Sequence, residues 1–253
     1  MIEIEGVSFA HRGTPVLRDV TVSLPKGGLT ALIGPNGAGK STLLSLVARL
    51  QPLQSGRIAV DGMPVDRTPG RLLARSLTIM RQDTGPVGRL TVRELVGFGR
   101  FPHSRGRQTA EDHRHIDASL ERFDLGDLAA RGLDTLSGGQ RQRAFVAMAF
   151  CQGTDYLLLD EPLNNLDPMY GRQMMRHLRD VVDGGQRTVV IVLHDINYAA
   201  AYADRILAMK DGRILADGTP AEVLTPDRLE ALFGYRMEVR EFEGRVHVLH
   251  HGP

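Results

Sequence analysis

A glycine-rich segment, Gly34 to Ser41, constrains this chain more than any other part of its sequence. It reads GPNGAGKS and fits the pattern G-x-x-x-x-G-K-[ST]. The apolar run 29–33 precedes it, and a helix-like segment, 42–48, follows it. In that setting, glycines permit positive φ and let backbone N–H groups close around phosphate oxygens at a helix N-terminus. A simple turn would need neither the lysine nor the serine, so the segment predicts a phosphate-binding loop.

Each polar side chain of this loop has an expected role. We expect the Lys40 ammonium to reach the outer phosphates of a nucleotide, and the Ser41 hydroxyl to ligate Mg²⁺. The predicted nucleotide-binding residues of the loop are Gly34, Pro35, Asn36, Gly37, Ala38, Gly39, Lys40, Ser41 and Thr42.

Charge and cysteine content exclude several classes of protein. Among 253 residues, 31 are Lys or Arg and 30 are Asp or Glu, so no overall positive field indicates a nucleic-acid partner. The single cysteine, Cys151, rules out an internal disulfide framework, and we expect it to be a small buried side chain. No leader-like start is visible and no apolar run approaches the roughly 18 residues of a membrane span. We therefore expect a cytosolic protein, or one that a partner holds at a membrane.

Hydrophobic patterning indicates an α/β fold. Residues 1–24 alternate as antiparallel strands with a turn at 11–15, and 51–65 reads as a short hairpin. A further strand is expected at 76–80. The continuous apolar runs at 156–159 and 188–193 are typical of parallel strands buried on both faces. Towards the end of the chain we expect a hairpin around 210–212, a helix at 220–233, and two strands around 243–244.

The middle of the chain, between Gln82 and Ser137, carries helical patterns instead. Thr91 and Glu94 have the spacing of a capping box, and a second helix is predicted at 110–125. The basic segment 100–107 is expected to be a solvated loop rather than a partner contact. His247, His250 and His251 are expected to belong to a surface tail rather than a metal site.

Two adjacent carboxylates, Asp160 and Glu161, end the apolar strand at 156–159. Neighbouring carboxylates repel each other, and a nearby Mg²⁺ would offset that repulsion. Asp160 is therefore predicted to hold Mg²⁺, directly or through water. Glu161 is predicted to polarise the water that attacks the γ-phosphate.

A second anion-binding helix start is predicted at Ser137. Ser137 and Gln140 have capping-box spacing, and Gly138 and Gly139 leave the backbone bare beside the helix start. A chain with one phosphate-binding loop has no obvious second phosphate to offer this site. We therefore hypothesise that a second subunit supplies it.

Taken together, these motifs resemble the nucleotide-binding subunit of ABC transporters over nearly the whole chain. The resemblance implies a P-loop NTPase with a parallel core sheet, an antiparallel β subdomain and a helical insertion at about 83–136. It also implies a C-terminal extension at about 204–253, all in one ABC ATP-binding domain, 1–253. In that family two subunits sandwich two ATP molecules, and Ser137, Gly138, Gly139 and Gln140 would face the nucleotide of the partner.

The same resemblance implies roles for four other residues. Gln82 would approach Mg²⁺ and the attacking water, and His194 would contact the γ-phosphate as a switch histidine. Asp167 would lie in the loop 165–167 across the dimer interface. The family usually places an aromatic residue upstream of the P-loop to stack on adenine, and here that position is His11. An imidazole can stack with less area than tyrosine, whereas the nearby Phe9 is expected in the core.

Two further stretches of sequence resemble particular branches of this family, which differ in the molecule that they transport. Leu90–Leu95, followed by Gly99–His103, resembles importers of ferric siderophores, haem and cobalamin, and 163–167 with 194–197 resembles the siderophore branch. The implied function is ATP hydrolysis for import of an iron complex, with ferric siderophore first and haem or cobalamin as alternatives. The implied partners are a second copy, transmembrane permease subunits and, indirectly, a substrate-binding protein, at the cytoplasmic face of the membrane. A soluble ABC ATPase acting on nucleic acid or ribosomes is the rival class, which usually has two cassettes or a long coiled-coil insertion.

Overall fold

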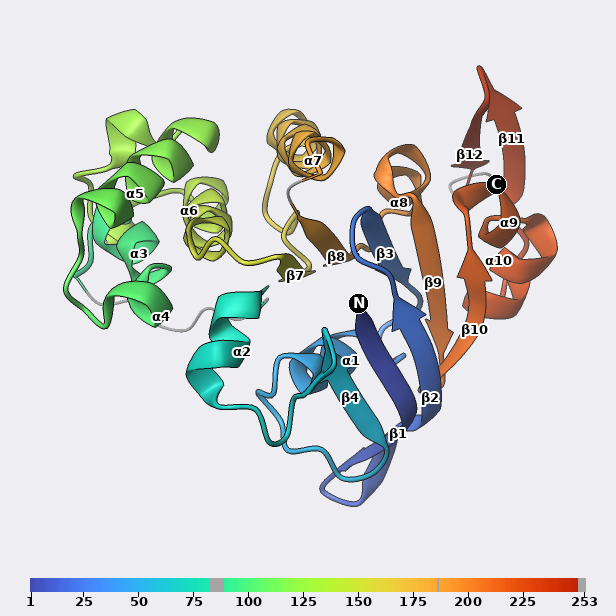
Figure 1. Ribbon diagram of the computed structural model, residues 1–253. Coiled ribbons are helices and arrows are strands. Elements are labelled where there is room, and N and C mark those ends of the chain that lie inside the picture. The colour runs from blue at the N-terminus through green and yellow to red at the C-terminus, as the bar shows by residue number, and fades with distance from the viewer. Residues whose placement is uncertain (82–88, 186, 250–253) are drawn as a thin grey trace. The chain divides into compact units, whose positions relative to one another are not determined.

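The structure is a computed structural model that describes residues 1–81, 89–185 and 187–249 (Figure 1). The chain divides into two compact units, which are described separately. The first unit contains residues 1–68 and the chain from Thr188 onwards, and the second unit is Pro69–Arg187. Among the described residues, no helix is long and apolar enough to cross a membrane.

The first unit begins with an antiparallel sheet whose strand order is β2-β1-β4-β5. Alternate residues of β1 are buried. Strand β2 pairs with β1 in antiparallel fashion, with Ile2 opposite Leu24 and Ile4 opposite Val22. The predicted alternation and the short hairpin are both confirmed. The strands are β1 (Ile2–His11), β2 (Thr14–Leu24), β4 (Arg57–Val60) and β5 (Met63–Pro64).

A second group of strands in this unit runs in the order β10-β9-β3-β8. Strand β3 is parallel to both of its neighbours, and every residue of β3 and β8 is buried, as the continuous apolar runs predict. Asp211 and Gly212 both have positive φ in the predicted turn between β9 and β10. The strands are β3 (Leu29–Ile33), β8 (Thr188–Val192), β9 (Arg205–Lys210) and β10 (Arg213–Gly218).

Among the residues described in the first unit there are four helices: α1 (Lys40–Val47), α8 (Ile196–Tyr202), α9 (Pro220–Val223) and α10 (Pro226–Phe233). The single helix predicted at 220–233 is wrong in one respect, because the chain leaves the helix at Leu224. Thr225 then caps α10 and Pro226 occupies its first turn, where a proline is tolerated because its missing N–H has no helical partner.

The C-terminal strands form a hairpin, β11 (Glu238–Phe242) with β12 (Arg245–Leu249), as predicted. The side chain of Asn197 in α8 ties the hairpin to that helix. Its Nδ2 donates to the Val248 carbonyl at 3.1 Å, and its Oδ1 accepts from the Val248 N–H at 2.9 Å. His247 is exposed in β12, whereas His250 and His251 lie outside the described residues.

The second unit contains the parallel pair β6 (Leu77–Met80) and β7 (Tyr156–Asp160). Its helices are α2 (Gly70–Ser76), α3 (Val92–Phe98), α4 (Phe101–Ser104), α5 (Ala110–Arg122), α6 (Gly138–Cys151) and α7 (Pro168–Asp183), with 3₁₀ turns at Gly126–Leu128 and Leu133–Thr135. The capping box at Thr91 is confirmed, and α6 packs against both α3 and α5. Helix α2 is not predicted by the sequence pattern, and it ends at Ser76, which the pattern assigned to the following strand.

The expectation of a solvated loop at 100–107 is wrong over its first half, because Arg100 is buried and residues 101–104 form the helix α4. Arg100, the residue before α4, is only 5% exposed. It forms an ion pair with Asp112 of α5, which is equally buried. Arg105 and Arg107 are exposed, as expected. Cys151 is buried as predicted, and burial raises the pKa of its thiol.

Candidate nucleotide-binding and hydrolysis site

The predicted phosphate-binding loop joins the buried strand β3 to the start of α1. Gly34 and Gly39 both have positive φ and lie against backbone of the first unit. A Cβ at Gly34 would overlap the Met209 carbonyl oxygen, and one at Gly39 would lie 3.1 Å from the Val16 carbonyl oxygen. By contrast, a Cβ on Gly37 would meet nothing within 4 Å. Glycine is therefore required at Gly34 and Gly39 by packing as well as by φ.

Lys40 is buried, 5% exposed, at the first position of α1. Its Nζ donates to the carbonyl oxygens of Gly34 at 2.8 Å and Pro35 at 3.0 Å. The ammonium is therefore held over the loop by oxygen acceptors, and phosphate oxygens are acceptors of the same kind. Ser41 and Thr42 follow in the first turn of α1, both half-buried.

His194 lies at the same edge of the first unit as this loop. It follows β8, which is parallel and adjacent to β3 with Leu32 opposite Val192, so the carboxyl ends of the two strands meet at one edge. Its side chain is exposed. Its predicted contact with the γ-phosphate stays a prediction.

The position expected to stack on adenine, His11, is the last residue of β1, paired with Thr14 and exposed. Phe9 is 6% exposed, which confirms its predicted place in the core. An exposed imidazole at the end of a hairpin is accessible to a base. Its stacking role stays a prediction.

The predicted carboxylates end β7 in the second unit. Asp160 is 5% exposed and Glu161 is 8% exposed, and Glu161 has a φ of 53°, which is strained for a residue with a side chain. Asn164 donates from Nδ2 to Glu161 Oε2 at 2.6 Å. Gln142 of α6 donates from Nε2 to the carbonyl oxygens of Glu161 at 3.3 Å and Pro162 at 3.2 Å. Asn164 thus orients the Glu161 carboxylate, and Gln142 of α6 holds the backbone of the same loop.

The predicted capping box at the start of α6 is confirmed. Ser137 Oγ accepts from the Gln140 N–H at 3.2 Å, and Gln140 Oε1 accepts from the Ser137 N–H at 3.1 Å. A Cβ on Gly139 would lie 3.3 Å from the Asn165 carbonyl oxygen, and a Cβ on Gly138 3.6 Å from Asn165 Cβ. Because the loop 165–167 lies directly against these glycines, a side chain at Gly139 would press on it.

Asp167 is the N-cap of α7, and its Oδ1 accepts from the Tyr170 N–H at 3.0 Å. It is therefore engaged within its own chain, in the loop that also contacts Gly138 and Gly139. Gln82, predicted to approach Mg²⁺ and the attacking water, lies outside the described residues.

The structure thus brings together two sets of predicted residues. The loop Gly34–Thr42 and His194 share one edge of the first unit. In the second unit, Gln142 and the loop 165–167 connect Glu161 to the start of α6. Sequence reasoning missed Gln142 and Asn164 as supports of Glu161. Gln142 left no distinct signal, because it lies within the polar run 140–143 at the start of the helix.

The donor chemistry fits Mg²⁺. Three side chains are predicted to hold it, of which Gln82 lies outside the described residues. The other two, Ser41 in the first unit and Asp160 in the second, offer only oxygen, which hard cations prefer. Mg²⁺ is usually held by one or two carboxylates together with substrate phosphates and water, rather than by a protein cage.

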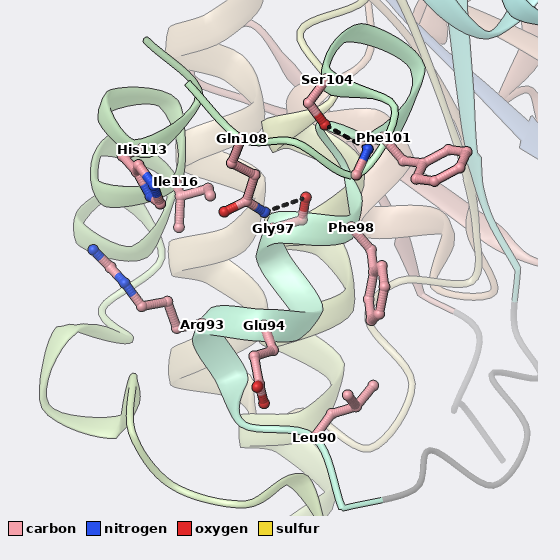
Figure 2. A pocket seen from close by; sticks show the side chains of 11 residues that line it. Leu90, Arg93, Glu94, Gly97, Phe98, Phe101, Ser104, Gln108, His113 and Ile116 are labelled. Carbon is pink, nitrogen blue, oxygen red and sulfur yellow. Dashed lines mark hydrogen bonds between the residues drawn. The ribbon is translucent and has the colours of Figure 1, made fainter. Parts of the chain in front are cut away.

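A separate cavity of about 380 Å³ lies among α3, α4 and α5 (Figure 2). Its wall includes the exposed faces of Phe98 and Phe101, which are 52% and 60% exposed. None of the predicted nucleotide-binding residues lines it, so it is distinct from the nucleotide site.

The chain is similar to a known protein family along much of its length. The model of the ABC transporter family matches residues 17–164. The petrobactin import ATP-binding protein FatE of Bacillus anthracis is 50% identical over 94% of this chain and 96% of its own length. YclP of Bacillus subtilis, also a petrobactin import ATP-binding protein, is 44% identical over 97% of each chain. The hemin import ATP-binding protein HmuV of Pseudomonas entomophila is 39% identical over 98% of each chain.

Solved structures agree with the sequence comparison. A dimeric bacterial ABC transporter cassette has a TM-score of 0.80 and 26% identity, covering 87% of this chain and 99% of its own. A dimeric ATP-binding cassette in a post-hydrolysis state, with bound ADP and Pi, has a TM-score of 0.79 and 26% identity, at the same coverage of both chains. The chain therefore belongs to the ABC transporter family, as an ATP-binding ATPase with the ABC ATPase fold.

Proposed function

We propose that this chain, as a single ABC ATP-binding domain spanning 1–253, hydrolyses ATP to drive import of an iron complex, most specifically a ferric siderophore. The hydrolytic part of this proposal rests on Glu161, which is buried, strained in its backbone and oriented by Asn164. The cargo rests on similarity: the two petrobactin relatives are 50% and 44% identical, above the 39% of the hemin relative. Haem and cobalamin import are the alternatives. A soluble ABC ATPase is the least supported class.

In the proposed binding step, Lys40 exchanges its two loop carbonyl partners for phosphate oxygens. The backbone N–H groups of Gly34–Ser41 and the start of α1 favour the same anion. His194 reaches the γ-phosphate from the neighbouring strand end, and His11 stacks on the base. When Mg²⁺ is bound, Ser41, Asp160 and Gln82 are the residues that hold it, and it supplies positive charge beside the phosphates.

In the proposed hydrolytic step, Glu161 accepts a proton from the attacking water, or aligns that water by a hydrogen bond. The bond from Asn164 to Oε2 restricts how the carboxylate turns, so that one oxygen is kept in a fixed direction. Gln82 completes the water site in this proposal.

The proposed assembly is a dimer of two copies of this chain. Ser137 Oγ accepts from the Gln140 N–H, so the hydroxyl hydrogen remains to be donated to an anion. With the bare backbone of Gly138 and Gly139, this forms a donor surface that fits the γ-phosphate bound by a second copy. ATP then bridges the two copies, and hydrolysis releases them, as in other switches that a γ-phosphate controls. The loop of Asp167 lies at this interface.

We further propose that the assembly is peripheral, on the cytoplasmic face of the membrane, bound to transmembrane permease subunits. A substrate-binding protein would act on it only indirectly. Helices α3 to α5, with the cavity beside Phe98 and Phe101, are the part of the second unit that would contact the permease. These apolar faces are the kind of surface that a partner helix covers.

Glu161→Gln tests the mechanism. We expect the variant to bind Mg-ATP, to lose hydrolysis by at least about a hundredfold, and to remain an ATP-bound dimer in light scattering. Glu121→Gln, a change on the exposed surface of α5, is the control and should behave as the original protein. A monomeric Glu161→Gln protein at saturating Mg-ATP would refute the proposal.

Uptake measurements test the cargo. Cells carrying Glu161→Gln are given labelled ferric siderophore, haem and cobalamin in turn. Loss of siderophore uptake alone supports the proposed cargo, and loss of haem or cobalamin uptake alone would select that alternative. Normal uptake of all three, in cells without a substituting relative, would refute import.

A further inference from the structure

The segment Gly99–His103 holds a charge that is too deeply buried for a surface motif. Arg100 and Asp112 are 5% and 4% exposed, and Arg100 Nε donates to Asp112 Oδ1 at 2.9 Å. Removing one partner of such a pair leaves an uncompensated charge in the interior, which is strongly unfavourable. The nucleotide chemistry described above uses neither residue.

Asp112 is fixed from its other side. Its Oδ2 accepts from both the N–H and the Oγ1 of Thr109, each at 2.9 Å, in the capping box that starts α5. Burial raises the pKa of Asp112, but these bonds and the Arg100 guanidinium outweigh it and lower the pKa to about 2. The ion pair therefore stays charged throughout the physiological range.

The far side of Arg100 holds the end of α6. Its Nη1 donates to the carbonyl oxygens of Cys151 at 3.1 Å and Gln152 at 3.2 Å. The ring nitrogen Nε2 of His103 lies 2.8 Å from the same Gln152 carbonyl oxygen. The last carbonyl groups of a helix have no partner within the helix, so Arg100 and His103 satisfy them from outside.

The side chain of Gln152 then connects this helix end to β6 and α2. Its Oε1 accepts from Thr78 Oγ1 at 2.7 Å, and its Nε2 donates to the carbonyl oxygens of Ala74 at 2.6 Å and Leu77 at 3.2 Å. One end of α6 is thus joined by side-chain hydrogen bonds to the start of α5, to α4, and to the strand that leads to Gln82. The other end carries Ser137.

We propose that Arg100 and Asp112 are positioning residues that set the direction of α6, and so place Ser137 and its glycines for the nucleotide of a second copy. Helix α6 has 14 residues and is therefore about 21 Å long. A tilt of about 10° at the clamped end moves the Ser137 end by about 3 to 4 Å, and misplacement of about 1 Å can already cost about a hundredfold in rate. This inference rests on the proposed role of Ser137.

The second unit offers a matched control. Arg93 of α3 and Asp117 of α5 also form an ion pair, but their side chains are 45% and 59% exposed. The control pair joins α3 to α5 and donates nothing to the end of α6. If the Arg100–Asp112 pair contributed only to the general stability of the fold, removing either pair would affect both nucleotide binding and dimer formation, to different degrees.

The test uses the double variant Arg100→Met with Asp112→Asn, in the Glu161→Gln protein. Asparagine keeps an acceptor for the Thr109 N–H, and no buried charge is left alone. Two quantities are measured: binding of a fluorescent ATP analogue to the monomer, and dimer formation with Mg-ATP by analytical ultracentrifugation. We expect analogue binding to stay within about twofold and dimer formation to weaken by about tenfold or more. Arg93→Met with Asp117→Asn should change neither quantity by more than about twofold.

Arg100→Lys supplies a second variant if the double variant unfolds. Lysine keeps the charge beside Asp112 but lacks the planar fork that also reaches the helix end, so dimer formation should be intermediate. Unchanged dimer formation in either variant would overturn the inference. Parallel loss of analogue binding and dimer formation would also overturn it, because that is general structural damage.

Ser137→Asp separates this inference from the proposed function. The added carboxylate would repel the phosphate of the partner copy. If Ser137→Asp still allows the dimer to form, the proposed function fails and the inference fails with it. If Ser137→Asp prevents the dimer while the Arg100 variants match the Arg93 control, the inference alone fails.

Discussion

Replacing Gly34 by alanine should destabilise the protein well beyond the effect of the same change at Gly37. Both glycines belong to the phosphate-binding loop and both have positive φ, at 143° and 80°. A Cβ on Gly34 would overlap the Met209 carbonyl oxygen in β9 and lie 3.1 Å from the carbonyl carbon, whereas a Cβ on Gly37 has open space around it. The pair therefore separates the steric effect from the effect of φ.

The expected magnitudes follow from these two terms. Alanine at positive φ costs about 1–2 kcal/mol in either variant. At Gly34, movement of the loop away from β9 adds about 1–3 kcal/mol, as for other overpacked sites. The free energy of unfolding should fall by about 2–5 kcal/mol for Gly34→Ala and by about 1–2 kcal/mol for Gly37→Ala. The gap corresponds to about 2–12 °C in Tm for a chain of this length.

Urea unfolding without nucleotide, followed by far-ultraviolet circular dichroism, measures this difference. The absence of nucleotide matters because a ligand that binds only the folded state would add its own stabilisation. If the two variants unfold at the same urea concentration, or if Gly34→Ala matches the original protein, the packing of the loop against β9 has been misjudged.

Three further predictions concern other parts of the chain. The pKa of Asp112 is lowered from 3.8 to about 2 in the folded protein. The stabilising contribution of Asp112 is therefore complete above about pH 4 and is lost as the pH falls towards 2. The variant Asp112→Asn lacks this contribution from the start. Across this window its free energy of unfolding, measured by urea titration, should therefore fall less than that of the control Asp117→Asn. Burial raises the pKa of the Cys151 thiol, so iodoacetamide at pH 7 should label it only in urea, and fast labelling of the native protein would contradict this. Asn197→Leu removes both bonds to Val248, so the amides of β11 and β12 should exchange hydrogen faster, and unchanged exchange would show that the tether does not matter.

Local signals in the sequence predicted much of the fold and the site. The capping boxes at Thr91 and Ser137 need partners only three residues away, so their spacing is sufficient evidence. The strand, glycine loop and helix around Lys40 are likewise contiguous. The parallel strands were recognisable because burial on both faces leaves a continuous apolar run.

The features that the sequence did not reveal depend on distant partners. Arg100 looks like one arginine in a basic segment, and only the fold brings it to Asp112 and to the carbonyl groups at 151 and 152. Asn164 and Gln142 meet Glu161 through a loop and a helix whose relative placement no periodicity specifies. Helix α2 is short and begins after Pro69, and a segment of that length gives too few turns for a reliable period.

The bond pair between Asn197 and Val248 also affects how this protein can associate. Strand β12 has β11 on one side, so its other side is an edge where backbone groups of another molecule could add a strand. At Val248 a single amide side chain already occupies both the N–H and the C=O that such an incoming strand would use. The hairpin is thereby protected at that point from edge-to-edge aggregation.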